Sequence, residues 1–565
     1  MHMYLRETRQ KRADGSLVTH LQLAESVWNP HKKRSEVRIL HNCGRAEDLK
    51  TAERLRTLAR SILKKCDPQE IVQHSAQWRL VDAWPYGPLY VLEALWQRLG
   101  IADVITDQLK GRKIDFAVER ALFAMVATRA CAPCSKLYCY EQWLREDVRI
   151  DGTDTLNLHH LYRAMDLLEA HKDSMEQALY FRLADLLNLD VELIFYDTTS
   201  LHFEIDEIDQ GHGDEELVEG SMAAGSKTYK APRKRGMAKN GRSDAPQIVI
   251  GLAVTRDGFP VRHWVFPGNT VDVTTVAQVK DDLKGWKLSR CVFVGDAGMV
   301  SQDNLERLST SGGKYIVWMP MRRGDEVPHD VLQRPGRFQQ VADNLRVKEV
   351  VVGEGERRRR YVVCHNPHEE KRQRTHRRQV LRELEAELAS LKDVRGESHS
   401  KRVCQLRASR RYGRYLRLTK RGGLRIDAAK RRAAEQLDGK FVVHSNDDSL
   451  SPADLALGYK QLQRVEEAWR SLKSGLRVRP VSHWAVHRIH DHVALNVLAL
   501  LLERVIEQAC GDTWRNIRAD LEQIKLAQLL SPHGEVWQGT EPAPEASNHL
   551  KRLDIKNPPA IVPLP

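Results

Sequence analysis

A short apolar run that ends in an aspartate occurs twice in this chain, and this repetition constrains the fold more than any other feature. Residues 193–196 form an apolar and aromatic run of buried-strand length, and we expect that strand to end at Asp197. Residues 292–294 form a second short strand, after which Gly295 permits a turn and Asp296 follows. A lone aspartate after a strand usually only begins a turn. Two of them predict carboxylates from separate strands that converge on one point, as a site for divalent cations requires.

A third carboxylate for such a site is expected on a helix further along the chain. Ser451 and Pro452 form an N-cap and first-turn pair, and the residues from there to Lys473 are mostly helix formers. On a helical wheel of about 100° per residue, Glu466 lies within roughly 60° of Tyr459 and Lys473. An apolar stripe adjoins these positions, which places Glu466 at the border between core and solvent. A solvated glutamate on an ordinary amphipathic helix would give the same local pattern.

Taken together, these residues resemble the DDE transposases of bacterial insertion sequences. The similarity is to the branch whose third acidic residue stands in the pattern Tyr, two residues, Arg, three residues, Glu, six residues, Lys. Tyr459, Glu466 and Lys473 match this pattern in register, whereas Leu462 occupies the arginine position. The stretches that also agree with the family are residues 196–199, 267–270, 295–298 and 438–441.

The resemblance implies an enzyme that binds the terminal inverted repeats of an insertion sequence, cleaves there and joins the 3′ ends to target DNA. It implies that Asp197, Asp296 and Glu466 are the catalytic residues and hold two Mg²⁺ ions, for which Mn²⁺ can substitute. It also implies a homodimer, because two ends of double-stranded DNA are joined at once. The DNA contacts expected with it are Tyr459, Lys473, Arg470 and Lys239. Arg464 or Arg470 is available for the phosphate contact of the missing arginine.

Two other functions fit the same residues. An RNase H-like nuclease or resolvase would cut DNA without joining it. A DNA-binding repressor derived from a transposase would bind DNA without catalysis, although such a protein usually lacks one of the acidic residues, and all three are present here.

Charge and hydropathy favour a DNA-binding protein. The 565 residues carry a net charge of +13, which suits a polyanionic partner. Nine cysteines scattered over this length indicate a reducing compartment. The longest apolar run, residues 493–502, is too short to cross a bilayer, and the N-terminus lacks the apolar core of a signal peptide. We therefore expect a bacterial cytoplasmic protein that does not bind membranes and associates with the nucleoid when it binds DNA.

The order of predicted elements indicates a mixed α/β fold. After the first acidic strand we expect strands at residues 247–254, 261–266, 292–294 and 314–319, with helices at 274–283 and 302–308. This order fits an RNase H-like catalytic core with a mixed five-stranded sheet and helices. In that topology Asp197 on the first strand lies beside Asp296 on the fourth.

Five regions are expected along the chain. Residues 1–45 are a small basic β-rich region with strands near 3–9, 17–27 and 36–42 and a hairpin turn at residues 13–15. Residues 46–189 are a helical DNA-binding or dimerisation region. Residues 190–321 and 438–510 form the catalytic core. Residues 322–437 are an insertion domain with strands and a basic helical hairpin, because this stretch is too long for a direct connection. Residues 511–565 hold a helix and, from Glu541, a proline-rich tail that is either an extended strap or disordered.

Other clusters allow two interpretations each. His483 and His487 stand one helical turn apart, and we expect core packing or contact with the DNA backbone rather than zinc. The pair Cys131 and Cys134 has no second pair at finger spacing, so we expect no zinc there either. Arginines between residues 402 and 417, interleaved with two tyrosines, fit a phosphate-binding surface or a solvated basic helix.

Overall fold

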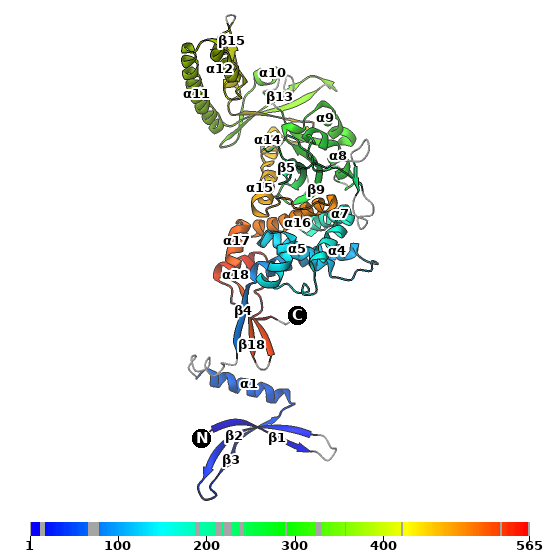
Figure 1. Ribbon diagram of the computed structural model, residues 1–565, viewed down its shortest axis with the longest axis vertical. Coiled ribbons are helices and arrows are strands. Elements are labelled where there is room, and N and C mark those ends of the chain that lie inside the picture. The colour runs from blue at the N-terminus through cyan, green and yellow to red at the C-terminus, as the bar shows by residue number, and fades with distance from the viewer. Residues whose placement is uncertain are drawn as a thin grey trace. The chain divides into compact units, whose positions relative to one another are not determined.

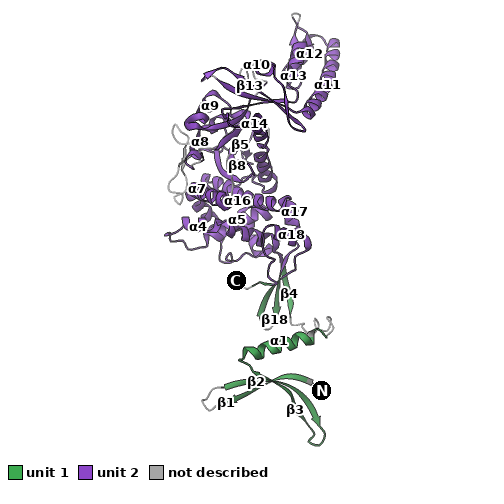
Figure 2. Cartoon of the chain, turned by 180° about the vertical axis from the view of Figure 1, so that it is seen from behind, with its two compact units in different colours: residues 1–83, 527–538, 561–564 green, residues 84–526, 539–560, 565 purple. Residues whose placement is uncertain are grey.

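The computed structural model describes residues 2–11, 17–65, 78–186, 193–209, 217–219, 228–237, 242, 244–286, 288, 291–319, 321, 329–355, 358–419, 422–531 and 534–562. The chain divides into two compact units, which Figure 2 colours separately. Unit 1 comprises residues 1–83, 527–538 and 561–564, and unit 2 comprises residues 84–526, 539–560 and 565. Within the described residues, no helix combines the length and the hydrophobicity that a membrane span needs.

Unit 1 begins with an antiparallel three-stranded sheet. Its strands are β1 (His2–Lys11), β2 (Leu17–Asn29) and β3 (Arg34–Arg45), which confirms the three predicted strands. The predicted turn at residues 13–15 lies outside the described residues. Helix α1 (Leu49–Leu63) follows, and the Asp48 side chain caps it by accepting from the backbone N–H of Lys50.

A second sheet was not expected from the sequence. Strand β4 (Arg79–Pro85) belongs to a four-stranded sheet with β18 (Lys525–Ser531), β19 (Gly534–Gly539) and β20 (Ile561–Val562). The prediction that residues 46–189 are helical throughout is therefore wrong at β4. The partners of β4 come from the far end of the chain, so a local pattern could not indicate them.

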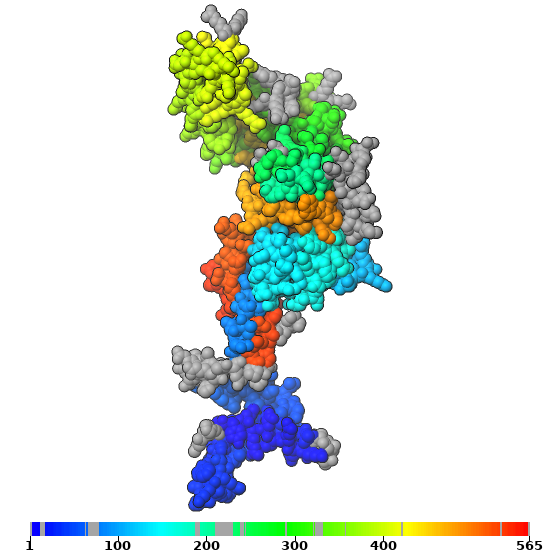
Figure 3. Space-filling model, in the orientation of Figure 1, coloured from blue at the N-terminus to red at the C-terminus, as the bar shows by residue number. Residues whose placement is uncertain are grey.

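The first helical layer of unit 2 packs around one central helix. It comprises α3 (Gly87–Arg98), α4 (Ile101–Gln108), α5 (Val118–Cys131), α6 (Lys136–Tyr138), the π-helix η1 (Cys139–Asp147) and α7 (Leu158–Leu186). Helix α16 (Val486–Cys510) packs against α5 and α7, so the orange C-terminal segment lies on the cyan helices in Figures 1 and 3. Helices α5 and α16 are buried on nearly all sides, because other helices pack around them and α16 also packs on β9.

The sheet of unit 2 contains the two acidic strands. Its predicted members are β5 (Leu193–His202), β8 (Gln247–Thr255), β9 (Pro260–Pro267), β10 (Val292–Gly295) and β11 (Lys314–Met319). Their order in space is β9-β8-β5-β10-β11. Strand β8 runs antiparallel to β5 and β9, whereas β10 runs parallel to β5 and β11. The predicted helices are also present, as α8 (Asp272–Lys284) and α9 (Gln302–Ser309).

Within the described residues the sheet has nine strands, so the prediction of five is wrong in number. Beyond β11 it continues with β17 (Lys440–Ser445), β14 (Arg359–His365), β13 (Leu345–Val352) and β12 (Gln339–Ala342). Strand β17 pairs with β11 on one side and with β14 on the other. Because β11 would otherwise be an open edge with unpaired backbone groups, the strands of the expected insertion extend the same sheet instead of forming a separate one.

The predicted helical hairpin rises from this extension. It contains α11 (Pro367–Ser390), α12 (Gly396–Ala408), the short strands β15 (Leu416–Leu418) and β16 (Leu424–Ile426), and α13 (Ala428–Gln436). Its own apolar cluster draws only on residues 380–434. Tyr415 is buried in that cluster, and Arg402 pairs with Glu387 of α11 at 2.7 Å. The tyrosine and this arginine are therefore occupied within the hairpin.

The remaining short elements and the C-terminal end complete the fold. They are β6 (Leu217–Glu219), β7 (Thr228–Lys230), α10 (His329–Gln333), α17 (Trp514–Leu521) and α18 (Pro544–Arg552). The prediction of an extended tail after residue 541 is wrong, because α18 buries Ala546 and Leu550 and has Pro544 in its first turn.

Candidate active site

Strands β5 and β10 bring Asp197 and Asp296 to neighbouring positions. The strands are parallel, and paired residues such as Val292 and Leu193 are 99 residues apart (292 − 193). Asp296 and Asp197 have the same separation (296 − 197), so they continue this register one pair beyond Gly295. The sheet therefore places two carboxylates side by side where β10 ends.

Asp197 lies within its strand rather than at its end. Strand β5 continues to His202, and Asp197 pairs with Leu252 of β8. The predicted strand end is therefore wrong, because the β-branched residues after Asp197 prolong the ladder with β8. The expectation for β10 is confirmed, since that strand ends at Gly295 and Asp296 then caps a 3₁₀ turn by accepting from the backbone N–H of Ala297 at 2.7 Å.

The segment that carries Glu466 docks on β5. Trp469 donates its indole N–H to Oδ2 of Asp197 at 3.2 Å, and Lys473 donates from Nζ to the hydroxyl of Thr199. Asp197 and Thr199 are two residues apart and share one face of the strand. Trp469 and Lys473 are one helical turn apart, so the helix lies along this face and touches both residues.

This segment is not one continuous helix. The structure has α14 (Pro452–Lys460), α15 (Gln463–Arg470) and the π-helix η8 (Ser471–Gly475). The predicted start is confirmed, since Ser451 and Asp454 form a capping box. At the junction the backbone N–H of Leu462 bonds to the carbonyl of Tyr459, three residues back, which tightens the turn. The single helical wheel is therefore wrong across residues 461–464, and Leu462 is buried there.

Tyr459 shows that the three carboxylates share one neighbourhood. Burial raises the pKa of the Tyr459 hydroxyl first of all, and the negative charges of Asp296, Glu466 and Asp197 raise the same pKa further. Its ring packs against Phe441 with ring centroids 5.7 Å apart. The three acidic side chains therefore lie near one phenol, although Asp197 and Glu466 are 269 residues apart in the chain (466 − 197).

The three carboxylates have the right chemistry for a hard divalent cation but are not drawn together around one. Oxygen ligands from separate elements suit Mg²⁺. Within the described residues, no group of three His, Cys, Asp or Glu side chains stands close enough to hold a metal ion. Glu466 is exposed, whereas Asp197 and Asp296 are partly buried. Two of the three candidate ligands thus lie side by side at the sheet, and the third lies on the helix that docks there.

Comparison with known proteins agrees with this arrangement. The family model described as a transposase DDE domain matches residues 222–502. The matched segment includes Asp296 and Glu466 and begins after Asp197. Among curated proteins no relative matches the chain.

One solved structure with some similarity to the chain is a cryo-EM structure of a piggyBac transposase synaptic complex with hairpin DNA. The match covers 77% of this chain and 79% of that chain, with 10% sequence identity and a TM-score of 0.32.

A further carboxylate near the candidate site was not singled out from the sequence. Asp272 opens α8, and the hydroxyl of Thr198 donates to its carboxylate. Gly298, which follows Asp296, lies so close that a β-carbon there would stand 3.2 Å from Oδ2 of Asp272. Asp272 therefore connects β5 to the turn after Asp296 from the other face of the sheet. Its place at a helix start beside the 267–270 stretch was the available signal.

The other predicted site residues are distributed differently. Arg470 is exposed on α15 and points away from the strand that Trp469 contacts. Lys239 lies outside the described residues. Tyr459 and Lys473 are half-buried beside the carboxylates, as described above.

The histidines after η8 belong to the helical core. His487 bonds through Nε2 to Oδ1 of Asp166 on α7 at 2.9 Å, and His492 bonds to the carbonyl of Val478 at 2.8 Å. His483 packs against His492 with ring centroids 5.4 Å apart. Of the two interpretations, core packing describes His487 and His492, because both are buried.

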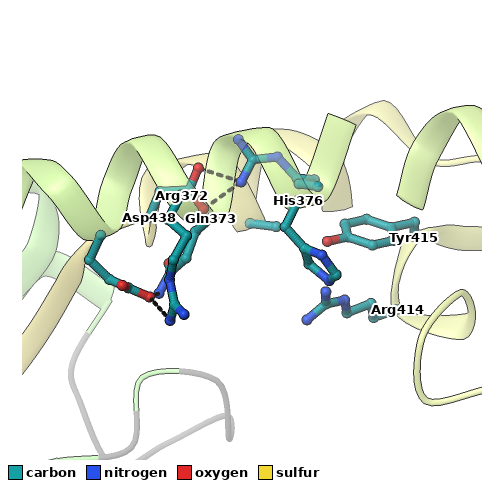
Figure 4. A pocket seen from close by; sticks show the side chains of 9 residues that line it. Arg372, Gln373, His376, Arg414, Tyr415 and Asp438 are labelled. Atoms are coloured by element: carbon teal, nitrogen blue, oxygen red, sulfur yellow. Dashed lines mark hydrogen bonds and ion pairs between the residues drawn. The ribbon is translucent and has the colours of Figure 1, made fainter. Parts of the chain in front are cut away.

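A pocket of about 440 Å³ lies in the helical hairpin, apart from the carboxylates. His376 and Arg414 stand at one end of it and Asp438 at the other (Figure 4). Arg377 and Asp438 form a buried ion pair, and Arg372 bonds to Glu369. The ion pair attaches α11 to the residues just before β17, whereas Arg372 and Glu369 both belong to α11. The ion pair gives this pocket a structural explanation.

Proposed function

We propose that the chain is a DNA transposase that binds the ends of an insertion sequence, cleaves them and joins the 3′ ends to target DNA. The observation that carries this proposal is the position of Asp197 and Asp296 on parallel strands, with the helix that bears Glu466 docked on the same face. The match to a transposase DDE domain supports it. The strand order β9-β8-β5-β10-β11 supports an RNase H-like core at its centre.

In this proposal Asp197, Asp296 and Glu466 hold two Mg²⁺ ions, or Mn²⁺ in their place. When bound, such ions supply activation of a water or 3′-hydroxyl nucleophile and stabilise the departing oxygen of a phosphodiester. The chain orients the ligands itself. Trp469 fixes one oxygen of Asp197, and the backbone N–H of Ala297 fixes one oxygen of Asp296, so both carboxylates are aimed before any ion binds.

Four residues are proposed to contact DNA. Lys473 presents a positive charge next to Asp197, where it would hold a phosphate as a point charge, and Thr199 keeps its Nζ in place meanwhile. The remaining proposed contacts are Tyr459, Arg470 and Lys239. Double-stranded terminal repeats and target DNA are the proposed partners, and a homodimer is expected in the DNA complex. The proposed location is the bacterial cytoplasm, at the nucleoid when DNA is bound.

Substitution of one ligand tests the proposed chemistry. Asp197→Asn keeps the size of the side chain but removes a negative charge from the site, so cleavage should fall below detection while binding of the element ends is unchanged. Asp257→Asn is a matched control, because Asp257 is exposed in the turn between β8 and β9. Gel-shift and cleavage measurements on the same labelled end fragment give both readouts. Retained cleavage by Asp197→Asn with Mg²⁺ would remove Asp197 from the mechanism.

Further measurements distinguish the proposed transposase from two other functions. A nuclease or resolvase would cleave the end fragments without joining them to a target plasmid. The separation of the three carboxylates favours the second candidate, a DNA-binding repressor without catalysis. A rise in melting temperature with Mn²⁺ that Asp197→Asn abolishes would support the transposase, whereas no rise in either protein would support the repressor.

A further inference from the structure

A large groove runs beside the segment that carries Glu466. Its volume is about 1240 Å³, which exceeds the roughly 300–1,000 Å³ of sites for small molecules. Its walls come from the loop after α5, from α15 and η8, and from α16 and α17. Arg470 lines it and directly follows Trp469, whose indole contacts Asp197. The groove and the candidate active site are therefore lined by consecutive residues of α15, Arg470 and Trp469.

Three arginines that line this groove are uncommitted, which here means that their side chains form no hydrogen bond or ion pair within the described residues. Arg470, Arg477 and Arg515 are all exposed. No side-chain hydrogen bond or ion pair within the described residues involves any of the three. They come from α15, from the loop after η8 and from α17, so three separate elements direct positive charge to one surface.

Arg477 also has an unusual backbone. Its φ is 48°, in the left-handed region that residues other than glycine rarely adopt. Its carbonyl accepts a hydrogen bond from Nη1 of Arg129 at 3.4 Å, which helps to hold this conformation. Backbone strain of this kind concentrates at functional sites. The fold thus keeps an exposed arginine in a strained conformation at the groove.

Two acidic residues of the groove are paired with their own arginines. Glu467 accepts from Nη1 of Arg464 at 3.1 Å, and Glu507 accepts from Nη1 of Arg504 at 2.7 Å. Arg504 also donates to the hydroxyl of Ser471. In each pair the positive and negative charges cancel. The charge of the three uncommitted arginines is therefore not reduced by these two carboxylates.

Of the other two acidic residues, Asp512 keeps its negative charge, because its hydrogen bonds lower the pKa of its carboxyl group. The carboxylate of Asp512 accepts from the backbone N–H of Thr513 and from the side chain of Asn516. Glu503 is buried, and burial raises the pKa of its carboxyl group well above the usual range, which favours the uncharged acid. The groove as a whole therefore presents an excess of positive charge.

We propose that this groove holds the sugar–phosphate backbone of duplex DNA next to the candidate active site, through Arg470, Arg477 and Arg515. The inference rests on the proposed function, because that function brings DNA to Asp197. The three guanidinium groups come from separate elements around one groove, and guanidinium binds phosphate through paired hydrogen bonds. An acidic protein segment is the competing occupant, and the test separates the two.

The salt dependence of DNA binding tests this proposal. Each lost phosphate contact lowers the slope of log K against log salt concentration by about 0.9, so replacing all three arginines by alanine should lower it by about 2.7. Binding of a fluorescent random-sequence duplex is measured by anisotropy in EDTA, so that cleavage plays no part. A matched triple variant replaces Arg112, Arg346 and Arg425, which are exposed and lie outside the groove. The slope of this control variant should differ from that of the wild type by less than the slope of the groove variant does.

Further variants make the outcome decisive. A triple Arg→Lys variant at the groove keeps the charges and should retain most of the slope. Melting temperatures establish that all variants fold. Equal slopes for the groove variant and the wild type, or equal losses in the groove and control variants, would overturn the groove assignment alone. Displacement of an acidic peptide, with an unchanged slope for DNA, would identify the competing occupant. A wild-type protein that binds no duplex would instead overturn the proposed function.

Discussion

The residue that decides how Asp197 is presented is Trp469. Its indole N–H bonds to the Asp197 carboxylate, and its ring is buried between α15 and the sheet. Trp469→Phe keeps an aromatic ring but removes the donor. Because hydrogen bonds to charged groups contribute about 1.5–3 kcal/mol, we expect the cleavage rate to fall about 10- to 100-fold. Single-turnover cleavage and DNA binding should be measured together. A loss of binding without a loss of rate would contradict this role.

Asp491 is a second residue with a testable role, in stability. It is fully buried on α16, and neither carboxylate oxygen has a hydrogen-bond partner among the described residues. Burial and the charges of Glu169 and Asp166 raise its pKa well above the usual range, while Lys172 and Arg488 act in the opposite direction. The folded protein therefore binds this proton more tightly than the unfolded chain does. Stability should fall as the pH rises from the unfolded pKa, near 4, towards the raised folded pKa.

Asp491→Asn should remove this dependence. The amide carries no charge, so the free energy of unfolding should rise at neutral pH by about 1.4 kcal/mol for each unit by which the pKa is raised. Urea unfolding at pH 5 and pH 8 measures the difference between variant and wild type. The stabilisation should be larger at pH 8. An equal effect at both pH values would show that the carboxyl group is not titrated in this range.

At the scale of an element, the junction between α14 and α15 explains the departure from the family pattern. Leu462 stands at the arginine position and is only 7% exposed, because the tightened turn directs it into the core. Leu462→Arg should therefore not restore a phosphate contact. It should lower the free energy of unfolding by about 3–5 kcal/mol, as an unpaired buried charge does. Thermal unfolding checks this, with Leu462→Met as the volume-conserving control. A stable variant with tighter DNA binding would contradict it.

At the scale of the whole molecule, the helical hairpin is inserted between two strands, β14 and β17, that pair with each other directly. His365 at the end of β14 pairs with Lys440 at the start of β17, so the hairpin leaves and re-enters the sheet at adjacent positions. Its apolar cluster is separate from the cores of the sheet. Replacement of residues 367–438 by an Asn-Gly turn should leave the remainder folded, since this turn suits two antiparallel strands.

Circular dichroism and thermal unfolding test this deletion. The melting temperature of the remainder should stay within a few degrees of the wild type, because the ion pair of Arg377 with Asp438 is removed as a whole and leaves no buried charge. Asp438→Ala in the full chain is the contrasting variant, since it leaves Arg377 buried without its partner. That variant should be destabilised by about 3–5 kcal/mol. An unfolded deletion protein would show that the hairpin is part of the sheet's core.

Local patterns predicted the elements that carry the candidate site. Strands β8, β9, β10 and β11, the helices α8 and α9 and the cap at Ser451 follow from short-range periodicity, turn residues and capping residues. The sequence also indicated the three candidate carboxylates, because Asp197, Asp296 and Glu466 each follow or belong to a predicted strand or helix. Physical interactions within about ten residues decide these features.

Only the tertiary structure decided how those elements meet. The length of β5, the bend at Leu462 and the nine-stranded sheet depend on partners far along the chain, as do the pairing of β4 with the C-terminal strands and the groove of uncommitted arginines. A strand ends where its ladder partner ends, and a helix bends where its side chains must fit another surface. These causes act between residues that are adjacent in space but distant in sequence.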